Sequence, residues 1–165
     1  MSRRKKLLGL LMAFGLSVGM CVTPVLAETT SILDEITEEE LTDEETTEDF
    51  AEDTSYSVLR GTNLNMGNVK IQKVSSNEIV VYGLTQCHKK CSKVYLSLFV
   101  ERKVNGSYGT YKIYEFTANN ATSLSKTIDI AVPSGTYYRV RGYHAASNGG
   151  LKESTSTLTS GIMVK

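Results

Sequence analysis

Residues 94–116 read VYLSLFVERKVNGSYGTYKIYEF, and this stretch decides the fold class. Before the Asn105-Gly106 pair, one set of alternate residues is apolar (Val94, Leu96, Leu98, Val100), and the set between them is Tyr95, Ser97, Phe99 and Glu101. Such alternation is typical of a strand that buries one face. Asn-Gly tolerates the positive φ values of a two-residue hairpin turn, and Tyr111 to Phe116 reads as the next strand. The stretch therefore predicts an antiparallel β-hairpin.

The same pattern extends through residues 58–165. Alternating runs are separated by turn residues, and no sustained helical period interrupts them. The expected turns are Ser75-Ser76-Asn77, Ala118-Asn119-Asn120, Pro133-Ser134-Gly135 and Ser147-Asn148-Gly149-Gly150. About seven or eight short strands with this spacing predict an all-β antiparallel sandwich of the immunoglobulin or fibronectin III type.

The N-terminus has the features of an export signal. A basic cluster at residues 3–6 precedes a run without charge at 7–22, and small or branched residues follow up to Ala27. This order predicts a secretory signal peptide over residues 1–27, cleaved before Glu28, and a secreted, extracellular product. The alternative is an uncleaved membrane anchor, which would be the only contact with a membrane.

Charge divides the remaining chain into two parts. Residues 28–56 carry 13 Asp and Glu and no Lys or Arg, whereas residues 57–165 carry 14 Lys and Arg against 5 Asp and Glu. A segment with so many like charges and so few apolar residues is expected to be disordered, and we place it at 28–57. It is either a solvated spacer or a counter-charge that folds back on the basic domain as a removable pro-segment.

Cys87-His88-Lys89-Lys90-Cys91 is the densest group of reactive residues. After signal cleavage only these two cysteines remain, and in an oxidising compartment they predict a disulfide. The loop that it closes is very short, so the expected stabilisation is about 2 kcal/mol. The alternatives are a metal site with His88 and His144, or a redox pair. The three-residue spacing and the lack of a second ligand pair argue against zinc, and the lack of a βαβ pattern argues against a redox pair, so we expect no metal and no cofactor.

Nothing in the sequence predicts catalysis. A Ser-His-Asp arrangement would need His88 or His144 with Asp129, and no nucleophile motif surrounds any serine. The five acids of the domain are spread over separate strands, which is not the paired-carboxylate pattern of a glycosidase. We therefore expect a non-enzymatic protein.

One stripe of residues is a candidate ligand face. If Tyr138, Val140 and Gly142 face the core, the alternate positions lie together on the other face of the strand. These positions are Tyr137, Arg139, Arg141 and Tyr143. Arginine and tyrosine suit phosphates, carboxylates and sugars. The alternative is that they only cover the outer surface of a sheet.

Two resemblances rest on these residues. The stretch from Gly135 onward resembles the closing hairpin of fibronectin type III and immunoglobulin-like domains, with Tyr138 as a candidate tyrosine corner, although the chain contains no tryptophan. The order Val81-Tyr82-Gly83, Cys87-His88, Cys91, Val94-Tyr95-Leu96 and Pro133-Ser134-Gly135 to His144 resembles small secreted proteins of clostridia and relatives, catalogued only as a domain of unknown function. That resemblance covers residues 58–165 and implies a secreted protein of Gram-positive bacteria, without implying an activity.

These observations together predict a secreted, non-enzymatic binding module of the cell envelope or the extracellular space. The expected partner is an anionic cell-wall polymer or an acidic glycan, and no nucleic acid is expected. A second hypothesis is a cationic antimicrobial or toxin-like effector that carries an acidic leader. A third is an uncharacterised hydrolase, which would need a polar pocket that brings His144 together with an acid.

Overall fold

The structure is a computed structural model that describes residues 42–57 and 61–165. The described residues form eight strands: β1 Glu45–Thr46, β2 Phe50–Tyr56, β3 Leu64–Ser75, β4 Glu78–Val104, β5 Ser107–Ala131, β6 Thr136–Asn148, β7 Leu151–Leu158 and β8 Gly161–Val164. A search of these residues finds no helix of the length and hydropathy needed to cross a membrane.

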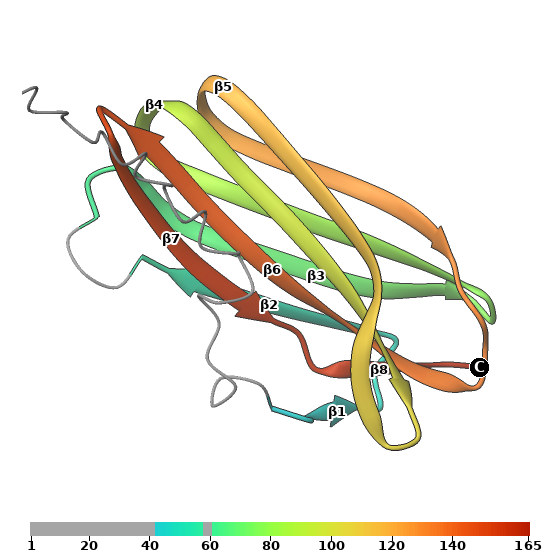
Figure 1. Ribbon diagram of the computed structural model, residues 1–165. Helices are drawn as coiled ribbons and strands as arrows, with labels where there is room; N and C mark the ends of the chain where they lie inside the picture. Colours follow the sequence, from blue (N-terminus) through green and yellow to red (C-terminus); the bar gives the residue numbers. More distant parts are fainter. Residues whose placement is uncertain (1–41, 58–60) are drawn as a thin grey trace, which may run out of the picture. The chain divides into compact units, whose positions relative to one another are not determined.

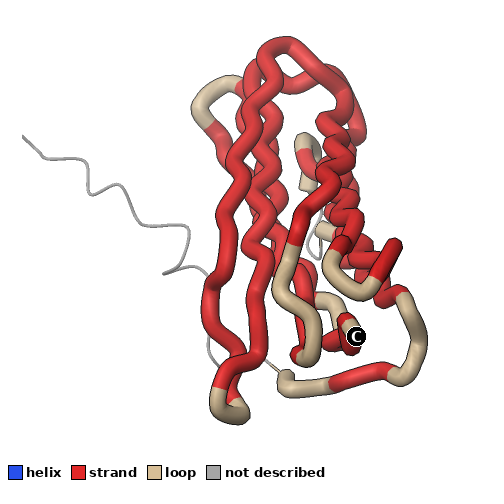
Figure 2. The backbone as a smooth tube through the Cα atoms, turned by 90° about the vertical axis from the view of Figure 1, so that its right-hand side faces the viewer, coloured by secondary structure: helices blue, strands red, loops and turns tan. Residues whose placement is uncertain are grey.

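Strands β4 and β5 are long because each contributes to both layers of the sandwich (Figure 1). The first half of β4 pairs with β3 and with the end of β5, and β2 lies on the far side of β3. The second half of β4 pairs with the start of β5 and with β6, which also pairs with β7 and β8. The eight strands therefore form one sheet that folds over on itself (Figure 2). The predicted all-β antiparallel sandwich is confirmed, with one parallel pair, β1–β8, added.

The hairpin that the sequence predicts at Asn105-Gly106 is present. Val104 pairs with Ser107, and the two turn residues have φ of 53° and 87°. The turn predicted at 118–120 is wrong, because β5 runs straight through it. Asn120 does adopt a positive φ of 51°. It lies opposite the register shift between Gln86 and Cys91 of β4, where the β4–β5 hairpin passes from one layer to the other.

The core lies between the two layers and follows the alternation of the sequence. Leu96 and Leu98 of one layer and Val69 of the other are fully buried. Tyr138 is also fully buried, and its hydroxyl donates a hydrogen bond of 2.8 Å to the carbonyl of Pro133. The predicted tyrosine corner is therefore confirmed, and it fastens the start of β6 to the turn before it.

The acidic segment predicted as disordered over 28–57 is ordered from residue 42 onward, so that part of the prediction is wrong. Strand β2 pairs with β3 along its whole length, from Phe50 opposite Gln72 to Tyr56 opposite Met66. Its backbone hydrogen bonds, rather than apolar side chains, attach it to the sheet. The fold therefore begins before residue 58. The signal peptide predicted at 1–27 and residues 28–41 lie outside the described residues.

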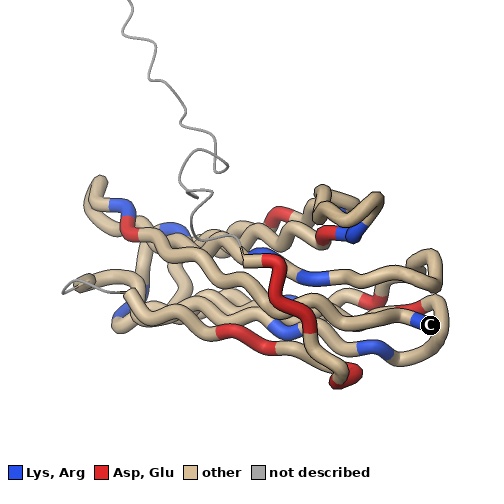
Figure 3. The backbone as a smooth tube through the Cα atoms, turned by 90° about the horizontal axis from the view of Figure 1, so that it is seen from below, with Lys and Arg blue, Asp and Glu red and all other residues tan. Residues whose placement is uncertain are grey.

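Four of the seven carboxylates of residues 42–57 contact cations or a backbone amide elsewhere in the domain. Lys73 lies 2.5 Å from Asp49, and an oxygen of Asp53 accepts a 2.8 Å hydrogen bond from the backbone of Leu158. Figure 3 shows the acids as red stretches of this segment, while Lys and Arg lie on other strands. The charge that the sequence separates is thus partly neutralised inside the fold.

Candidate functional site

The four residues of the predicted stripe lie on the outer face of the second layer, as their spacing requires. Tyr138 and Val140, between them, are fully buried in the core. Arg139, Arg141 and Tyr143, however, are only 4%, 8% and 2% exposed, so most of the stripe is not open to solvent as the sequence suggested. The two arginines share a partner on the neighbouring strand.

That partner is Glu101, which lies opposite Arg139 on β4. Its carboxylate accepts from Arg139 Nε at 2.7 Å and lies 3.1 Å from Arg141 Nη2, and Glu101 itself is only 4% exposed. Arg141 also stacks over the Phe99 ring at 5.0 Å, and its buried Nε finds no hydrogen-bond acceptor among the described residues. One carboxylate therefore serves two guanidinium groups, and a second carboxylate, that of Asp43, lies 3.6 Å from Nη1 of Arg139.

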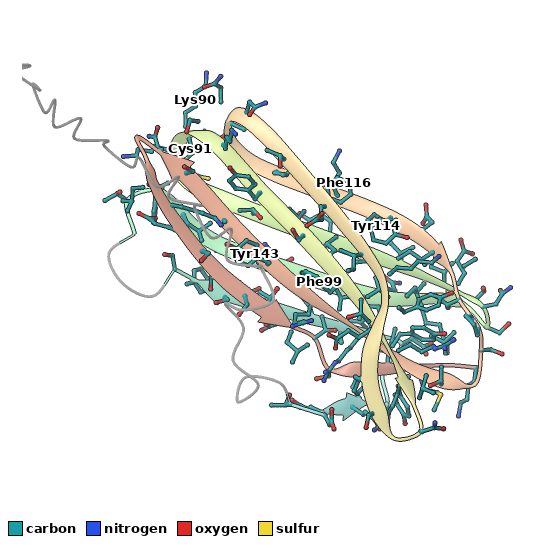
Figure 4. All side chains as sticks on the ribbon, viewed as in Figure 1. Lys90, Cys91, Phe99, Tyr114, Phe116 and Tyr143 are labelled. Atoms are coloured by element: carbon teal, nitrogen blue, oxygen red, sulfur yellow. The ribbon has the colours of Figure 1, made fainter. Side chains whose placement is uncertain are left out.

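An aromatic pocket lies on the same face. Its volume is about 300 Å³, and strands β4 to β7 line it with Tyr95, Ser97, Glu115, Phe116, Thr117, Tyr143 and Lys152. The strand register explains the grouping, since Ser97 pairs with Glu115 on one side and with Tyr143 on the other. Figure 4 shows Tyr143 near Phe99 on the neighbouring strand, and these two residues belong to a small apolar cluster on this face.

The pocket combines three kinds of groups that recognise sugars and anions. Lys152 Nζ lies 5.8 Å from the ring centre of Tyr95 and 5.2 Å from that of Tyr143, so a cation is held against two aromatic faces. Glu115 and Ser97 add oxygen acceptors and a hydroxyl. Aromatic faces with a few convergent polar groups are typical of ligand sites.

A second feature, which we call the basic corner, consists of Lys103, Tyr108 and Arg139. The Arg139 guanidinium lies 4.0 Å from the centre of the Tyr108 ring, and Lys103 Nζ lies 5.4 Å from it. Gly161 of β8 makes room for this tyrosine, because a Cβ there would lie 1.9 Å from the Tyr108 hydroxyl. Burial and the nearby Glu45 carboxylate raise the pKa of Tyr108. The phenol therefore stays neutral between two cations.

Cys87 and Cys91 lie where β4 crosses between the layers. Between these two residues β4 bulges, since Gln86 pairs with Ser123 and Cys91 already pairs with Ala121. The bulge brings the two buried thiols within hydrogen-bonding reach, and they are free in the structure. Burial, followed by the contact with Cys91, raises the pKa of the Cys87 thiol to about 12. The disulfide stays a prediction, which this proximity favours.

The other two hypotheses for this region involve the histidines. Among residues 42–57 and 61–165, no three His, Cys, Asp or Glu side chains are grouped as metal ligands. His88 is exposed, whereas His144 is fully buried between threonine hydroxyls: Nδ1 lies 3.0 Å from Thr85 and Nε2 lies 2.9 Å from Thr157. Burial lowers the pKa of His144 to about 4. The imidazole is thus a neutral core residue, hydrogen-bonded at both nitrogens.

Sequence reasoning missed Glu101 as the partner of the arginines and missed the basic corner altogether. The alternation did place Glu101 on the outer face, but only the register shows that Arg139 lies opposite it. The burial of His144 could have been found, because the spacing that buries Tyr138 and Val140 also buries this residue. The basic corner has no local signal, since its residues come from three different strands.

A family model supports the extent of this domain. A family of unknown function (DUF6147) matches residues 32–162, and the chain belongs to this family. The match begins at Ile32, so it includes β1, β2 and the acidic residues before them. The resemblance to a domain of unknown function is thus confirmed, and the family unit is longer than the 58–165 domain that the sequence suggested. No curated protein matches the chain.

Proposed function

We propose that this family member is a secreted, non-enzymatic binding module that contacts an anionic polymer or an acidic glycan through the outer face of β4 to β7. The observation that supports the proposal is the aromatic pocket of about 300 Å³, which lies on the same face as the buried Arg139 and Arg141. The pocket supplies aromatic rings, hydroxyls and one cation.

The mix of groups favours a sugar-containing, acidic ligand over a purely ionic one. Tyr95 can pack against the apolar face of a sugar ring, while Glu115 can bond its hydroxyls. Ser97 and Tyr143, which are only 3% and 2% exposed, line the buried side of the pocket. Lys152 lies where a carboxylate or phosphate of the same chain would be attracted. A simple polyanion would use the lysine but would gain nothing from the rings or from Glu115.

Export and oxidation are part of the same proposal. Cleavage after Ala27 would release a chain that begins at Glu28 outside a Gram-positive cell. There the thiols of Cys87 and Cys91 would meet an oxidant and form a disulfide. Because both residues border the bulge of β4, the bond would fix the crossing of the long hairpin between the layers.

The competing hypothesis of a cationic effector with an acidic leader has less support. Residues 42–165 carry 14 Lys and Arg against 12 Asp and Glu, because seven of the acids are built into or beside β1 and β2. The folded domain is therefore close to neutral. The hydrolase hypothesis required an acid beside His144, and both of its ring nitrogens face threonines instead.

Affinity electrophoresis of the mature protein tests the proposal. We expect a gel that contains polygalacturonate or a glycerol-phosphate polymer to retard the protein, and a gel with neutral dextran to leave it unretarded. Tyr95→Ala and Lys152→Ala should each weaken the retardation several-fold. The matched controls Tyr82→Ala and Lys70→Ala change the same residue types at paired positions of β4 and β3 on the other layer, and they should have little effect. Absence of retardation by either acidic polymer at low salt would refute the proposal.

A further inference from the structure

We infer that the basic corner is an anion-binding subsite which residues 42–46 of the same chain occupy, so that this segment competes with an acidic ligand. We call residues 42–46 the plug. The inference deepens the proposed function and rests on it for the nature of the external ligand. The subsite and its occupation by the plug rest only on contacts within the domain.

The residues of the subsite come from strands that do not include the plug. Lys103 comes from β4, Tyr108 from β5 and Arg139 from β6, and the tyrosine ring is near both cations, at 5.4 Å and 4.0 Å. Glu101 fixes Arg139 from the other side at 2.7 Å. Gly161 leaves the space that the Tyr108 hydroxyl needs. Two cations thus lie against one aromatic ring.

The plug presents its carboxylates to these two cations. Glu45 lies 2.6 Å from Lys103 Nζ, and Asp43 lies 3.6 Å from Arg139 Nη1. Arg139 Nη1 also donates to the carbonyl of Thr42, and the Tyr108 hydroxyl donates to Glu45 at 3.4 Å. The Glu45 carboxylate raises the pKa of Lys103, which keeps that cation charged. The subsite is therefore filled by anionic groups of the protein itself.

The attachment of the plug is slight in comparison with that of β2. Strand β1 has two residues and one parallel partner, whereas β2 pairs with β3 at seven positions. The side chain of Asp43 is 67% exposed and that of Glu45 27% exposed, and ion pairs of such groups are individually weak. A polymer that offers many anionic groups can therefore replace the plug while the rest of the sheet stays intact.

The spacing of the plug defines the ligand class. Asp43 and Glu45 are two residues apart in an extended chain, so their attachment points are separated by about 7 Å. A polymer with carboxylates or phosphates at a similar repeat would reproduce both ion pairs. A second pocket of about 320 Å³, lined in part by Arg102, Tyr108 and Tyr111, adjoins the corner and offers the polymer room to continue.

A pair of double variants of the full mature chain tests the inference. Asp43→Asn with Glu45→Gln removes the two carboxylates that contact the subsite. Glu44→Gln with Glu48→Gln makes the same change of net charge in the same segment, at side chains that contact no cation in the described part of the chain. Titration with polygalacturonate and with the glycerol-phosphate polymer separates carboxylate from phosphate ligands.

We expect the Asp43/Glu45 variant to bind at least one of the two polymers about fivefold more tightly than the Glu44/Glu48 variant. Equal gains in the two variants would show that only net charge matters. No gain in either would show that the plug does not cover the ligand site. Both results overturn the inference.

A second measurement keeps the subsite separate from the proposed polymer function. Inorganic phosphate is added to the wild-type protein and to each of the two double variants. The amide resonances of Tyr108, Arg139 and Gly161 are followed by NMR. We expect these resonances to shift only when Asp43 and Glu45 are neutralised. If they shift and no polymer binds, the subsite stands and the proposed function fails. If phosphate moves them equally in all three proteins, or in none, the inference fails whatever the polymers do.

Discussion

Acidification from pH 7.5 to pH 5 should destabilise the domain through His144. The imidazole lies fully buried between the layers, and its hydrogen-bond partners are the hydroxyls of Thr85 and Thr157. Among residues 42–57 and 61–165, no carboxylate forms an ion pair with this imidazole. Burial lowers the pKa of His144 from 6.5 to about 4. The unfolded chain therefore binds a proton at a higher pH than the folded domain, so stability is full above pH 6.5 and falls as the pH drops towards 4.

The size of the effect follows from the two pKa values. The difference between the two pKa values corresponds to about 3 kcal/mol in total, of which about 2 kcal/mol is lost by pH 5. Glu153 acts in a different window. Burial would raise its pKa, but hydrogen bonds from the amides of Leu64, Asn63 and Thr62 lower it below 4.5. Its contribution is therefore lost only at still lower pH.

Urea unfolding of the mature protein, followed by far-UV circular dichroism at several pH values, measures this effect. The wild type and the matched variant His88→Gln, which alters the exposed histidine, should both lose about 2 kcal/mol between pH 7.5 and pH 5. His144→Gln will lower the stability at neutral pH but should remove most of this pH dependence. If His144→Gln retains the full loss over the same interval, the buried imidazole is not its cause.

Further predictions concern the core, the thiols and export. Gly67→Ala should cost about 2 kcal/mol or more in urea unfolding, because a Cβ there would lie 2.2 Å from the imidazole of His144, whereas Gly109→Ala, which meets open space, should be nearly neutral. Tyr138→Phe should cost about 1 kcal/mol by the same measurement, since it removes the hydroxyl of the tyrosine corner. The secreted protein should resist thiol labelling until it is reduced, and Cys87→Ser should then cost about 2 kcal/mol; two free thiols with stoichiometric zinc would contradict this. N-terminal sequencing should begin Glu-Thr-Thr, and an uncleaved membrane-bound product would refute cleavage after Ala27.

Features that depend on local spacing could be predicted from the sequence. The Asn105-Gly106 hairpin follows from the φ values that these residues accept, and the burial of Val140 follows from the alternation of its strand. The tyrosine corner at Tyr138 follows from a resemblance over a short stretch. Each of these needs only neighbouring residues, so the rest of the fold did not have to be known.

Features that depend on register could not be predicted. The alternation along its own strand was enough to place Arg139 on a candidate ligand face. Its partner Glu101 lies 38 positions away in the chain, and the two residues are brought together only by the register between β4 and β6. Strand β2 escaped prediction for a related reason. Within it only Ala51 is buried, so its attachment depends on backbone pairing with β3, which its composition does not reveal.

The acidic segment shows why a count of charges was misleading. A run of like charges is expected to repel itself and stay solvated, but that expectation assumes that no cation is held nearby. Here Lys73, Lys103 and Arg139 are fixed by the sheet at the positions that Asp49, Glu45 and Asp43 reach. Added salt weakens these internal pairs and the contacts with an external polyanion alike. A salt titration alone therefore cannot separate the two, whereas neutralising Asp43 and Glu45 against Glu44 and Glu48 changes only the internal competition.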